Sequence, residues 1–402
     1  MSSIQAEDAL QSMVDAGDLA GAVTLIWREG AIAEVTCAGW RDPDARLPVE
    51  RDTLFRVASL TKPITAAATL SLVEEGRFEL SDPITRWAPE LARMQVLRAP
   101  GGALTDTVPA RRPLTFHDLL THRAGLSYSD FLQGPIAAAY RDALGGHIDN
   151  ARSPDEWIAR LAELPLLHQP GEVFEYGHAA DLLGFILARV EDAPLGEVLR
   201  RRVFEPLGMV DTGFAVPEAK RPRRAACCGF DADGQVRTRA TVPGAHALPE
   251  RPEGMTFVSG GQGLWSTVDD YLSFARIFVE GGAGLLRPET VARMTTNQLT
   301  APQRAASMML GRPLFATGHG FGLGVAVVTE PESADPLLCG GNRGAVGWPG
   351  AYGSWWRADP VERSVRIFMT HNMVEAEQLA QGVGLGVWTA ILEFQEQALR
   401  SP

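Results

Sequence analysis

The chain has 402 residues, of which 45% are hydrophobic and 21% are charged, a composition typical of globular proteins that bury a sizeable core. Its formal net charge of −12 disfavours nucleic acids and anionic membranes as partners. Four cysteines are too few for a disulfide scaffold, and no stretch approaches the roughly 20 apolar residues of a membrane span. The first residues lack the basic start and apolar core of a signal peptide. We therefore expect a soluble, cytoplasmic protein, whose oligomeric state is not predicted.

The hydrophobic pattern at the start of the chain predicts a helix, two strands and a second helix. Residues 4–16 are expected to be helical. Strands are expected at 22–27 and 31–37, joined by a hairpin turn at 28–30. An Ala/Leu-rich run over 64–75 predicts a helix that ends before Gly76, as helices commonly do.

Residues 79–255 have a different texture, in which helical patches alternate with loops rich in proline and glycine. The patches predict helices at 116–121, 154–164, 179–190 and 195–204. Periodicity is weakest over 216–255, which predicts a long surface excursion with one hairpin turn at 231–234.

Regular patterns return after the glycine-rich run 259–263. Ser266 and Asp269 form a weak capping box that opens a helix reaching about residue 280. Strands are predicted at 321–328, 353–358 and 364–370, followed by a final helix over 376–399. Strands at both chain ends predict an α/β domain of the α+β type from residues 1–78 and 256–402, with an inserted, mostly helical domain over 79–255. A cleft between two such parts is a usual place for an active site.

Lysine is scarce in this chain. Of 37 basic residues, only Lys62 and Lys220 are lysine. Arginine cannot lose its proton in a protein, whereas lysine can do so when it is desolvated. Lys220 lies in a Lys-Arg-Pro-Arg-Arg run that is typical of a solvated loop. Lys62 is therefore the candidate for a titrating role.

Lys62 ends an S-x-x-K motif, Ser59-Leu60-Thr61-Lys62, at the start of the second predicted helix. Residues three apart share a helical face, so the lysine amine can reach the serine hydroxyl. Serine is a weak nucleophile that needs an adjacent base, and a helix N-terminus supplies a positive dipole and free N–H groups for an oxyanion. The pattern indicates nucleophilic catalysis, although by itself it also fits a capping serine beside a surface lysine.

Other catalytic signatures are missing from the sequence. No serine lies in G-x-S-x-G, and there is no H-E-x-x-H. His117 and His122 are five residues apart, the wrong spacing for two metal ligands on one helical face. The run GHGFGLG at 318–324 lacks the ending of a nucleotide-binding loop and leads into a strand. We expect neither a metal nor another cofactor.

Six stretches resemble, in the same order, the motif regions of the serine β-lactamase and penicillin-binding-protein superfamily. They are LFRVASLTKPITAAATLSLVEEGRFELSDPITRWAPEL, LTFHDLLTHRAGLSY, PGEVFEYGHAADLLGFILARV, VFEPLGMVDTGF, SGGQGLWSTVDDYLSFARIF and GWPGAYGSWWRADP. Within the superfamily, the chain is most similar to the class C β-lactamase-like branch that includes the family VIII carboxylesterases. The resemblance covers nearly the whole chain and implies a β-lactamase/transpeptidase-like fold, with an antiparallel sheet flanked by helices.

The resemblance also implies roles for individual residues. Ser59 is the acylated nucleophile, Lys62 is its general-base partner, and Tyr176 is the tyrosine of the second motif, here Tyr-Gly-His. A phenol with the usual pKa of about 10 can relay a proton when a nearby ammonium lowers that pKa. The backbone N–H groups of Ser59 and Ala351 are expected to form the oxyanion hole.

The sequence departs from the β-lactamases at two motifs. His178 replaces the second-motif asparagine, and the usual K-T-G is Trp348-Pro349-Gly350, as in the carboxylesterase branch. The stretch 350–353 is expected to be an edge strand. Candidates for a substitute cation are Arg343 and Arg357. The implied substrate-binding residues are Trp348, Gly350, Tyr128, Phe131 and His178, with Trp265, Trp355 and Trp356 as further pocket candidates.

These implications favour a serine carboxylesterase that hydrolyses small carboxylic esters through a Ser59 acyl-enzyme, with acyl transfer to alcohols or amines as a second outcome. One alternative is a β-lactamase or D-Ala-D-Ala peptidase-like enzyme, which the missing third-motif lysine and the expected cytoplasmic location disfavour. The other alternative is a non-catalytic binding module on the same fold, which the retained Ser59, Lys62 and Tyr176 disfavour. The natural ester is not predicted.

Overall fold

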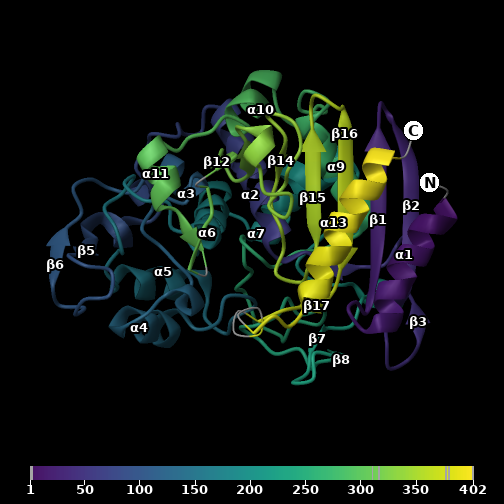
Figure 1. The fold of residues 1–402 in the computed structure, drawn as a ribbon. Helices are drawn as coiled ribbons and strands as arrows, with labels where there is room; N and C mark the ends of the chain where they lie inside the picture. Colours follow the sequence, from purple (N-terminus) through teal and green to yellow (C-terminus); the bar gives the residue numbers. More distant parts are fainter. Residues whose placement is uncertain (1–2, 310, 316, 376–377, 379–380, 401–402) are drawn as a thin grey trace.

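The computed structural model describes residues 3–309, 311–315, 317–375, 378 and 381–400 (Figure 1). Among these residues, eight strands form one antiparallel sheet in the order β12-β13-β14-β15-β16-β1-β2-β3. The strands are β1 (Gly21–Arg28), β2 (Ala31–Asp42), β3 (Leu47–Pro48), β12 (His319–Phe321), β13 (Ala326–Val328), β14 (Val346–Gly347), β15 (Trp355–Asp359) and β16 (Ser364–Thr370). The two chain ends meet within the sheet, because β1 pairs with β16 from Ala22↔Thr370 to Arg28↔Ser364.

Both faces of the sheet are covered by helices, which explains why β1 is buried along nearly its whole length. Successive side chains of a strand point to opposite faces. Val23 and Leu25 join the apolar cluster that contains α2 (Thr61–Glu74) and α9 (Val268–Ala275). Ala22 and Ile26 join the cluster that contains α1 (Ser3–Ala16) and α13 (Leu385–Arg400). Figure 1 shows α13 in yellow and α1 in purple lying over that second face.

The middle of the chain forms a mostly helical part beside the sheet (Figure 1). Its helices are α3 (Phe116–Leu120), α4 (Pro135–Leu144), α5 (Pro154–Ala162), α6 (Ala179–Glu191), α7 (Leu195–Leu199), a π-helical turn (Arg200–Phe204) and α8 (Glu205–Leu207). Its strand pairs are β5 (Gln95–Leu97) with β6 (Thr107–Pro109) and β7 (Cys228–Phe230) with β8 (Val236–Thr238). Helix α6 packs against α2 and α3 and so joins this part to the rest.

The remaining elements lie in the last third of the chain. They are α10 (Pro288–Met294), α11 (Ala301–Ala306), the hairpin of β10 (Met308–Met309) and β11 (Arg312–Pro313), and β17 (Asn372–Met373), which runs parallel to β7. None of the described helices combines the length and the apolar character that a bilayer crossing requires.

A short strand pair fixes the segment that leads into α2. Strand β4 (Phe55–Arg56) pairs with β9 (Trp265–Ser266), and the Val57 N–H donates to the Leu264 carbonyl at 3.0 Å. The Leu264 N–H donates in turn to the Thr61 hydroxyl at 3.2 Å, in the first turn of α2. The S-x-x-K motif is therefore held beside the glycine-rich run 259–263, although the two are far apart in sequence.

The predicted fold class is confirmed, with an antiparallel sheet built from both chain ends and helices on both faces. The hairpin turn at 231–234 is also confirmed, because β7 and β8 pair across it. The domain limits 1–78, 79–255 and 256–402 stay a prediction.

Several element limits differ from the prediction. The run 321–328 is split into β12 and β13 by a turn at 322–325. The helix expected from Ser266 begins at Val268, because the Thr267 side chain caps it by accepting from the Asp270 N–H. Helix α2 begins at Thr61, before the predicted start at residue 64, because a proline at 63 is tolerated in the first turn of a helix. The described part of the last helix begins at Leu385, and residues 376–377 and 379–380 of the expected helix lie outside the described residues.

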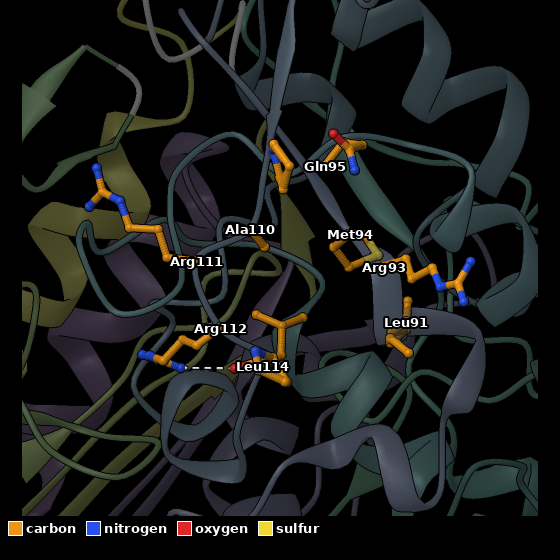
Figure 2. Close-up of a pocket in the computed structure, with 11 residues that line it drawn as sticks. Leu91, Arg93, Met94, Gln95, Ala110, Arg111, Arg112 and Leu114 are labelled. Atoms are coloured by element: carbon orange, nitrogen blue, oxygen red, sulfur yellow. Dashed lines mark hydrogen bonds between the residues drawn. The ribbon is translucent and has the colours of Figure 1, made fainter.

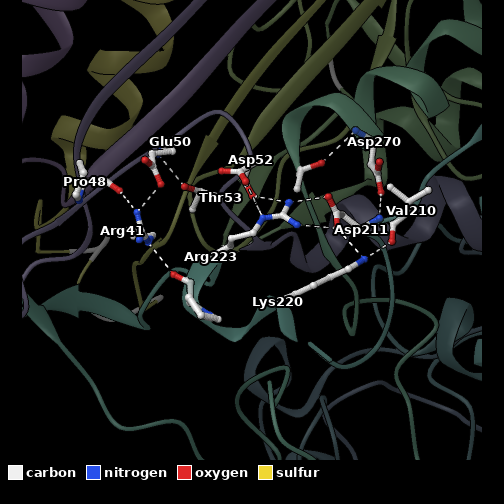
Figure 3. A network of polar contacts seen from close by, with 12 residues as sticks. Arg41, Pro48, Glu50, Asp52, Thr53, Val210, Asp211, Lys220, Arg223 and Asp270 are labelled. Carbon is white, nitrogen blue, oxygen red and sulfur yellow. Dashed lines mark hydrogen bonds and ion pairs between the residues drawn. The ribbon is translucent and has the colours of Figure 1, made fainter. Parts of the chain in front are cut away.

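Lys220, predicted in a solvated loop, lies in a 3-10 helix (Glu218–Arg223) and belongs to a network of ion pairs (Figure 3). Its ammonium lies 2.8 Å from the Asp211 carboxylate, which also pairs with Arg223 at 2.6 Å. Arg223 reaches the Asp52 carboxylate at 2.9 Å. These ion pairs tie the surface excursion to the loop before β4, so Lys220 has a structural place remote from Ser59.

Replacing Gly177 by alanine should destabilise the fold. A Cβ atom at this position would lie 2.3 Å from backbone atoms of Ser127, which cannot move aside as a flexible side chain could. Overpacking of this kind costs about 1–3 kcal/mol, so we expect a lower Tm in thermal unfolding. Gly101→Ala is the matched control, because a Cβ there meets nothing within 4 Å. Equal Tm values for Gly177→Ala and the wild type would contradict this close approach.

Candidate active site

Ser59 and Lys62 lie together at the buried start of α2. Ser59 sits in a single 3-10 turn, Ala58–Leu60, that runs directly into the helix. The Lys62 Nζ donates to the Ser59 Oγ at 3.1 Å, the contact that the i, i+3 spacing predicts. The exposed fraction is 6% for Ser59 and 2% for Lys62, so bulk water does not separate the two groups.

The backbone at Ser59 is held under strain by its surroundings. Ala58 has a φ of 44°, a left-handed conformation that costs a non-glycine residue of the order of 1–3 kcal/mol. Gly350 packs against the same segment, and a Cβ on it would lie 2.7 Å from the Val57 carbonyl oxygen. The strained turn therefore persists because β4 and the 350–353 segment enclose it, and it fixes the direction of the Ser59 side chain.

Tyr176 completes a hydrogen-bonded trio. It lies just before α6, and its hydroxyl donates to the Ser59 Oγ at 2.7 Å. The Trp348 indole N–H donates to the Tyr176 oxygen at 3.0 Å, and the two rings are 5.1 Å apart. A donor aimed at a phenolic oxygen stabilises negative charge there. Trp348, expected to contact substrate, therefore also orients and polarises the Tyr176 hydroxyl.

The amine of Lys62 has a backbone carbonyl and two aromatic rings as neighbours. Its Nζ donates to the Gly261 carbonyl at 3.0 Å. The same nitrogen lies 4.6 Å from the Tyr176 ring centroid and 5.4 Å from the Tyr128 ring centroid, distances at which an aromatic face attracts an ammonium. Tyr128 therefore lies beside the trio. Phe131 also lies near it, because its ring stacks on the Tyr176 ring with 6.1 Å between the ring centroids.

His178 is buried behind Tyr128, and its expected role in substrate binding stays a prediction. It is 1% exposed, its Nδ1 bonds the Asp181 carboxylate at 2.9 Å, and Tyr128 packs on its ring at 4.6 Å. Burial lowers the pKa of His178 in spite of the neighbouring carboxylate. Burial alone would raise the pKa of Asp181, but hydrogen bonds from His178 and Ser259 and the charge of Lys62 hold it below its usual value. Asp181 is therefore an anion beside a neutral imidazole.

The expectation of an edge strand at 350–353 is wrong. These residues form a turn closed by the Gly353 N–H donating to the Gly350 carbonyl at 3.0 Å, and the following strand, β15, lies inside the sheet between β14 and β16. The turn still lies beside Ser59, through the contact of Gly350 with Val57. Within the described part of the chain, neither the Ser59 N–H nor the Ala351 N–H donates to a carbonyl outside the regular helices and strands.

The other candidates lie elsewhere. Trp355 packs under α13, Trp356 packs against Tyr271, and Trp265 stacks on the Arg56 guanidinium at 4.1 Å, so these indoles belong to the core. Arg357 is buried against Gln395 and Arg343 is exposed in the turn before β14. Neither arginine has a contact with Ser59, Tyr176 or Trp348 among the described residues, which disfavours both as substitute cations.

Three neighbours of the trio were missed by sequence reasoning. The Gly261 N–H donates to Asp181 and the Gly261 carbonyl accepts from Lys62, and His122 lies 5.1 Å from the Tyr176 ring. Burial, together with the nearby Lys62 charge, lowers the pKa of His122 to about 3, so its ring is neutral. The glycine-rich run 259–263 was a signal of close backbone approach, whereas nothing local distinguished Asp181 from an ordinary acid at a helix N-terminus.

A surface pocket of about 400 Å³ lies apart from this trio (Figure 2). It is lined by segments 91–95 and 109–114 and contains none of the predicted site residues. Arg112 at its wall is paired with Asp118, and Arg111 is paired with Glu172. Two of the three arginines that line it are thus engaged in ion pairs.

Comparisons with known proteins show the family of the chain. The family model described as Beta-lactamase matches residues 6–383. The chain is 46% identical to Protein Rv1367c of Mycobacterium tuberculosis (strain ATCC 25618 / H37Rv), covering 90% of this chain and 88% of that protein. It is 34% identical to Esterase EstB of Burkholderia gladioli, covering 89% and 87%.

A solved structure shows the same fold at 25% identity. It is described as EstCE1, a hydrolase with promiscuous acyltransferase activity, and it matches with a TM-score of 0.78 over 97% of this chain and 98% of that chain. The resemblance inferred from the six motif stretches is thereby confirmed. The chain belongs to the beta-lactamase family.

Proposed function

We propose that the protein is a serine carboxylesterase that cleaves small carboxylic esters through an acyl-enzyme on Ser59. The observation that carries the proposal is the pair of hydrogen bonds from Lys62 and Tyr176 to one buried serine oxygen. A nucleophile and a base within 2.6–3.2 Å, with the second group oriented by a third, is the arrangement that nucleophilic catalysis needs. The relatives named esterase and hydrolase support serine hydrolase chemistry for this family member.

The proposed reaction has two halves. In the first, the Ser59 oxygen bonds the ester carbonyl carbon, and its proton passes to the amine of Lys62 in its neutral form or to the Tyr176 oxygen as a phenolate. The carbonyl oxygen becomes an oxyanion that accepts from the N–H groups of Ser59 and Ala351. The proton then goes to the leaving alkoxide as the C–O bond breaks. In the second half, water gives a proton to the same groups and bonds the acyl carbon, the bond between that carbon and the Ser59 oxygen breaks, and the proton passes to Ser59 as the carboxylic acid leaves.

Trp348 supports an ester in preference to a β-lactam. A β-lactam substrate carries a carboxylate, and a buried carboxylate without a partner costs several kcal/mol. At the position where β-lactamases have the third-motif lysine, this chain presents an indole that is 2% exposed and already donates to Tyr176. An uncharged ester carries no such penalty beside an apolar ring.

Acyl transfer to an alcohol or amine is a second outcome of the same acyl-enzyme. The description of EstCE1 as a hydrolase with promiscuous acyltransferase activity favours it as a side reaction here. The aromatic cluster of Tyr128, Tyr176 and Trp348, with Phe131 against it, would disfavour water relative to an apolar alcohol at the acyl carbon.

Ser59→Ala should abolish ester hydrolysis and leave the fold intact. Without the hydroxyl no acyl-enzyme forms, so kcat on p-nitrophenyl butyrate should fall below a few per cent of wild type and a fluorophosphonate probe should add no mass. Ser364→Ala, which removes another buried serine at the far end of β16, is the control and should keep full activity and labelling. Appreciable turnover by Ser59→Ala would exclude Ser59 as the nucleophile, and no labelling of the wild type would favour a binding module.

Lys62→Arg should be nearly as damaging as Lys62→Ala. Arginine keeps the charge but cannot accept a proton at neutral pH, and loss of a general base typically costs 10²–10⁴-fold. The measurement is kcat/KM for both variants beside Lys220→Arg, which changes the other lysine of the chain and should match the wild type. Recovery of most activity by Lys62→Arg would make Lys62 an electrostatic residue.

Ester cleavage should exceed β-lactam turnover by about two orders of magnitude or more in kcat/KM. The reason is the unpaired carboxylate beside Trp348, at about 1.4 kcal/mol per tenfold in rate. The test is steady-state kinetics of one preparation on p-nitrophenyl butyrate and nitrocefin. A gain of nitrocefin turnover in Trp348→Lys would support the stated cause, and comparable values for the two substrates would overturn the esterase assignment.

A further inference from the structure

We infer that Asp181 is a positioning residue that holds Lys62 through the backbone of Gly261, an inference that rests on the proposed roles of Ser59 and Lys62. Gly261 connects the two side chains directly. Its N–H donates to the Asp181 Oδ1 at 3.0 Å, and its carbonyl accepts from the Lys62 Nζ at 3.0 Å. The carboxylate and the ammonium therefore fix opposite sides of the same residue.

Gly261 leaves no room for a side chain between these groups. A Cβ on it would lie 3.1 Å from the Asp181 Oδ1, 3.1 Å from the Tyr128 hydroxyl and 3.4 Å from the Lys62 Nζ. The Asp181 carboxylate and the Lys62 ammonium thus approach the same small volume, in which a hydrogen atom is the only substituent that fits without a shift.

The Asp181 carboxylate also organises the loop around Gly261. The Ser259 hydroxyl donates to Oδ1 and accepts from the Gln262 N–H at 2.8 Å. From the other side, the Thr65 hydroxyl of α2 donates to the Gly260 carbonyl at 2.7 Å. The loop 259–262 is therefore held by hydrogen bonds to the Asp181 carboxylate on one side and to α2, the helix that carries Lys62, on the other.

The charges in this region also indicate that Asp181 acts on Lys62. Asp181 is 0% exposed, and its second oxygen is occupied by His178 at 2.9 Å. Because His178 is neutral, Asp181 supplies a negative charge near the Lys62 ammonium. A buried cation is costly without a compensating anion, so this carboxylate stabilises the ammonium that Lys62 becomes when it takes the proton of Ser59.

Loss of the carboxylate should therefore act on acylation. In Asp181→Asn the amide can replace one acceptor oxygen but presents N–H donors to His178 or to the Gly261 N–H. The loop would loosen, the Gly261 carbonyl would no longer hold Lys62, and the 3.1 Å contact with Ser59 would be lost. A misplacement of about 1 Å at a reacting group can cost about 10²-fold in rate.

The test is a double-mutant cycle between Asp181→Asn and Lys62→Ala. The readouts are the rate of Ser59 labelling by a fluorophosphonate and kcat/KM on p-nitrophenyl butyrate. Asp181→Asn should lower both about a hundredfold when Lys62 is present and by less than about twofold in the Lys62→Ala background, because its effect passes through Lys62. An equal loss in both backgrounds, which a merely structural role produces, would overturn the inference.

Asp359→Asn is the matched control. Asp359 is also 0% exposed and accepts from backbone N–H groups, at Asn342 and Val361, but lies at the end of β15. This variant should keep the wild-type labelling rate. If Asp181→Asn does not fold, Ser259→Ala removes one donor to the carboxylate and should show a smaller loss with the same dependence on Lys62.

The outcomes separate this inference from the proposed function. If Ser59→Ala is inactive and Asp181→Asn labels at the wild-type rate, the positioning role is wrong and the serine hydrolase assignment stands. If Ser59→Ala remains active, both are wrong.

Discussion

The Ser59 oxygen accepts two hydrogen bonds, from Lys62 at 3.1 Å and from Tyr176 at 2.7 Å. The site depends on this pair of contacts, because the second joins segments that are far apart in sequence. Lys62 reaches Ser59 because both lie at the start of α2. Tyr176 comes from another segment, so its hydroxyl can bond the Ser59 oxygen only when the residues before α6 are held beside the start of α2. The β4–β9 pair and the packing of α6 on α2 provide this constraint, because they hold both segments against the same buried helix.

Glycines allow the segments around the site to approach one another closely. Gly177 lies against the backbone of Ser127, Gly350 against the Val57 carbonyl, and Gly261 between Asp181 and Lys62. At each of these positions a Cβ would come within about 3 Å of atoms that have little freedom to move. The same close packing holds Ala58 in its left-handed conformation and so fixes the orientation of Ser59.

Sequence reasoning recovered the parts of the site that depend on local spacing or on the order of motifs. Ser59 and Lys62 follow from i, i+3 geometry, and Tyr176 and Trp348 follow from the resemblance. Contacts between distant segments were not accessible, since no pattern around Asp181 indicates its bond to Gly261. The hydrogen bond between His178 and Asp181 was likewise not predicted from the sequence. The 350–353 turn was missed because its glycines fit a strand end and a turn equally.

The central claim is that an ester acylates Ser59 before water acts. Rapid mixing with excess p-nitrophenyl butyrate, acid quench and intact-mass measurement test this most directly, with peptide mapping of the modified enzyme. We predict a burst of p-nitrophenol no larger than the enzyme concentration, together with a butyryl adduct on the peptide that contains Ser59. Turnover without any adduct, or an adduct mapped to another residue, would contradict the account.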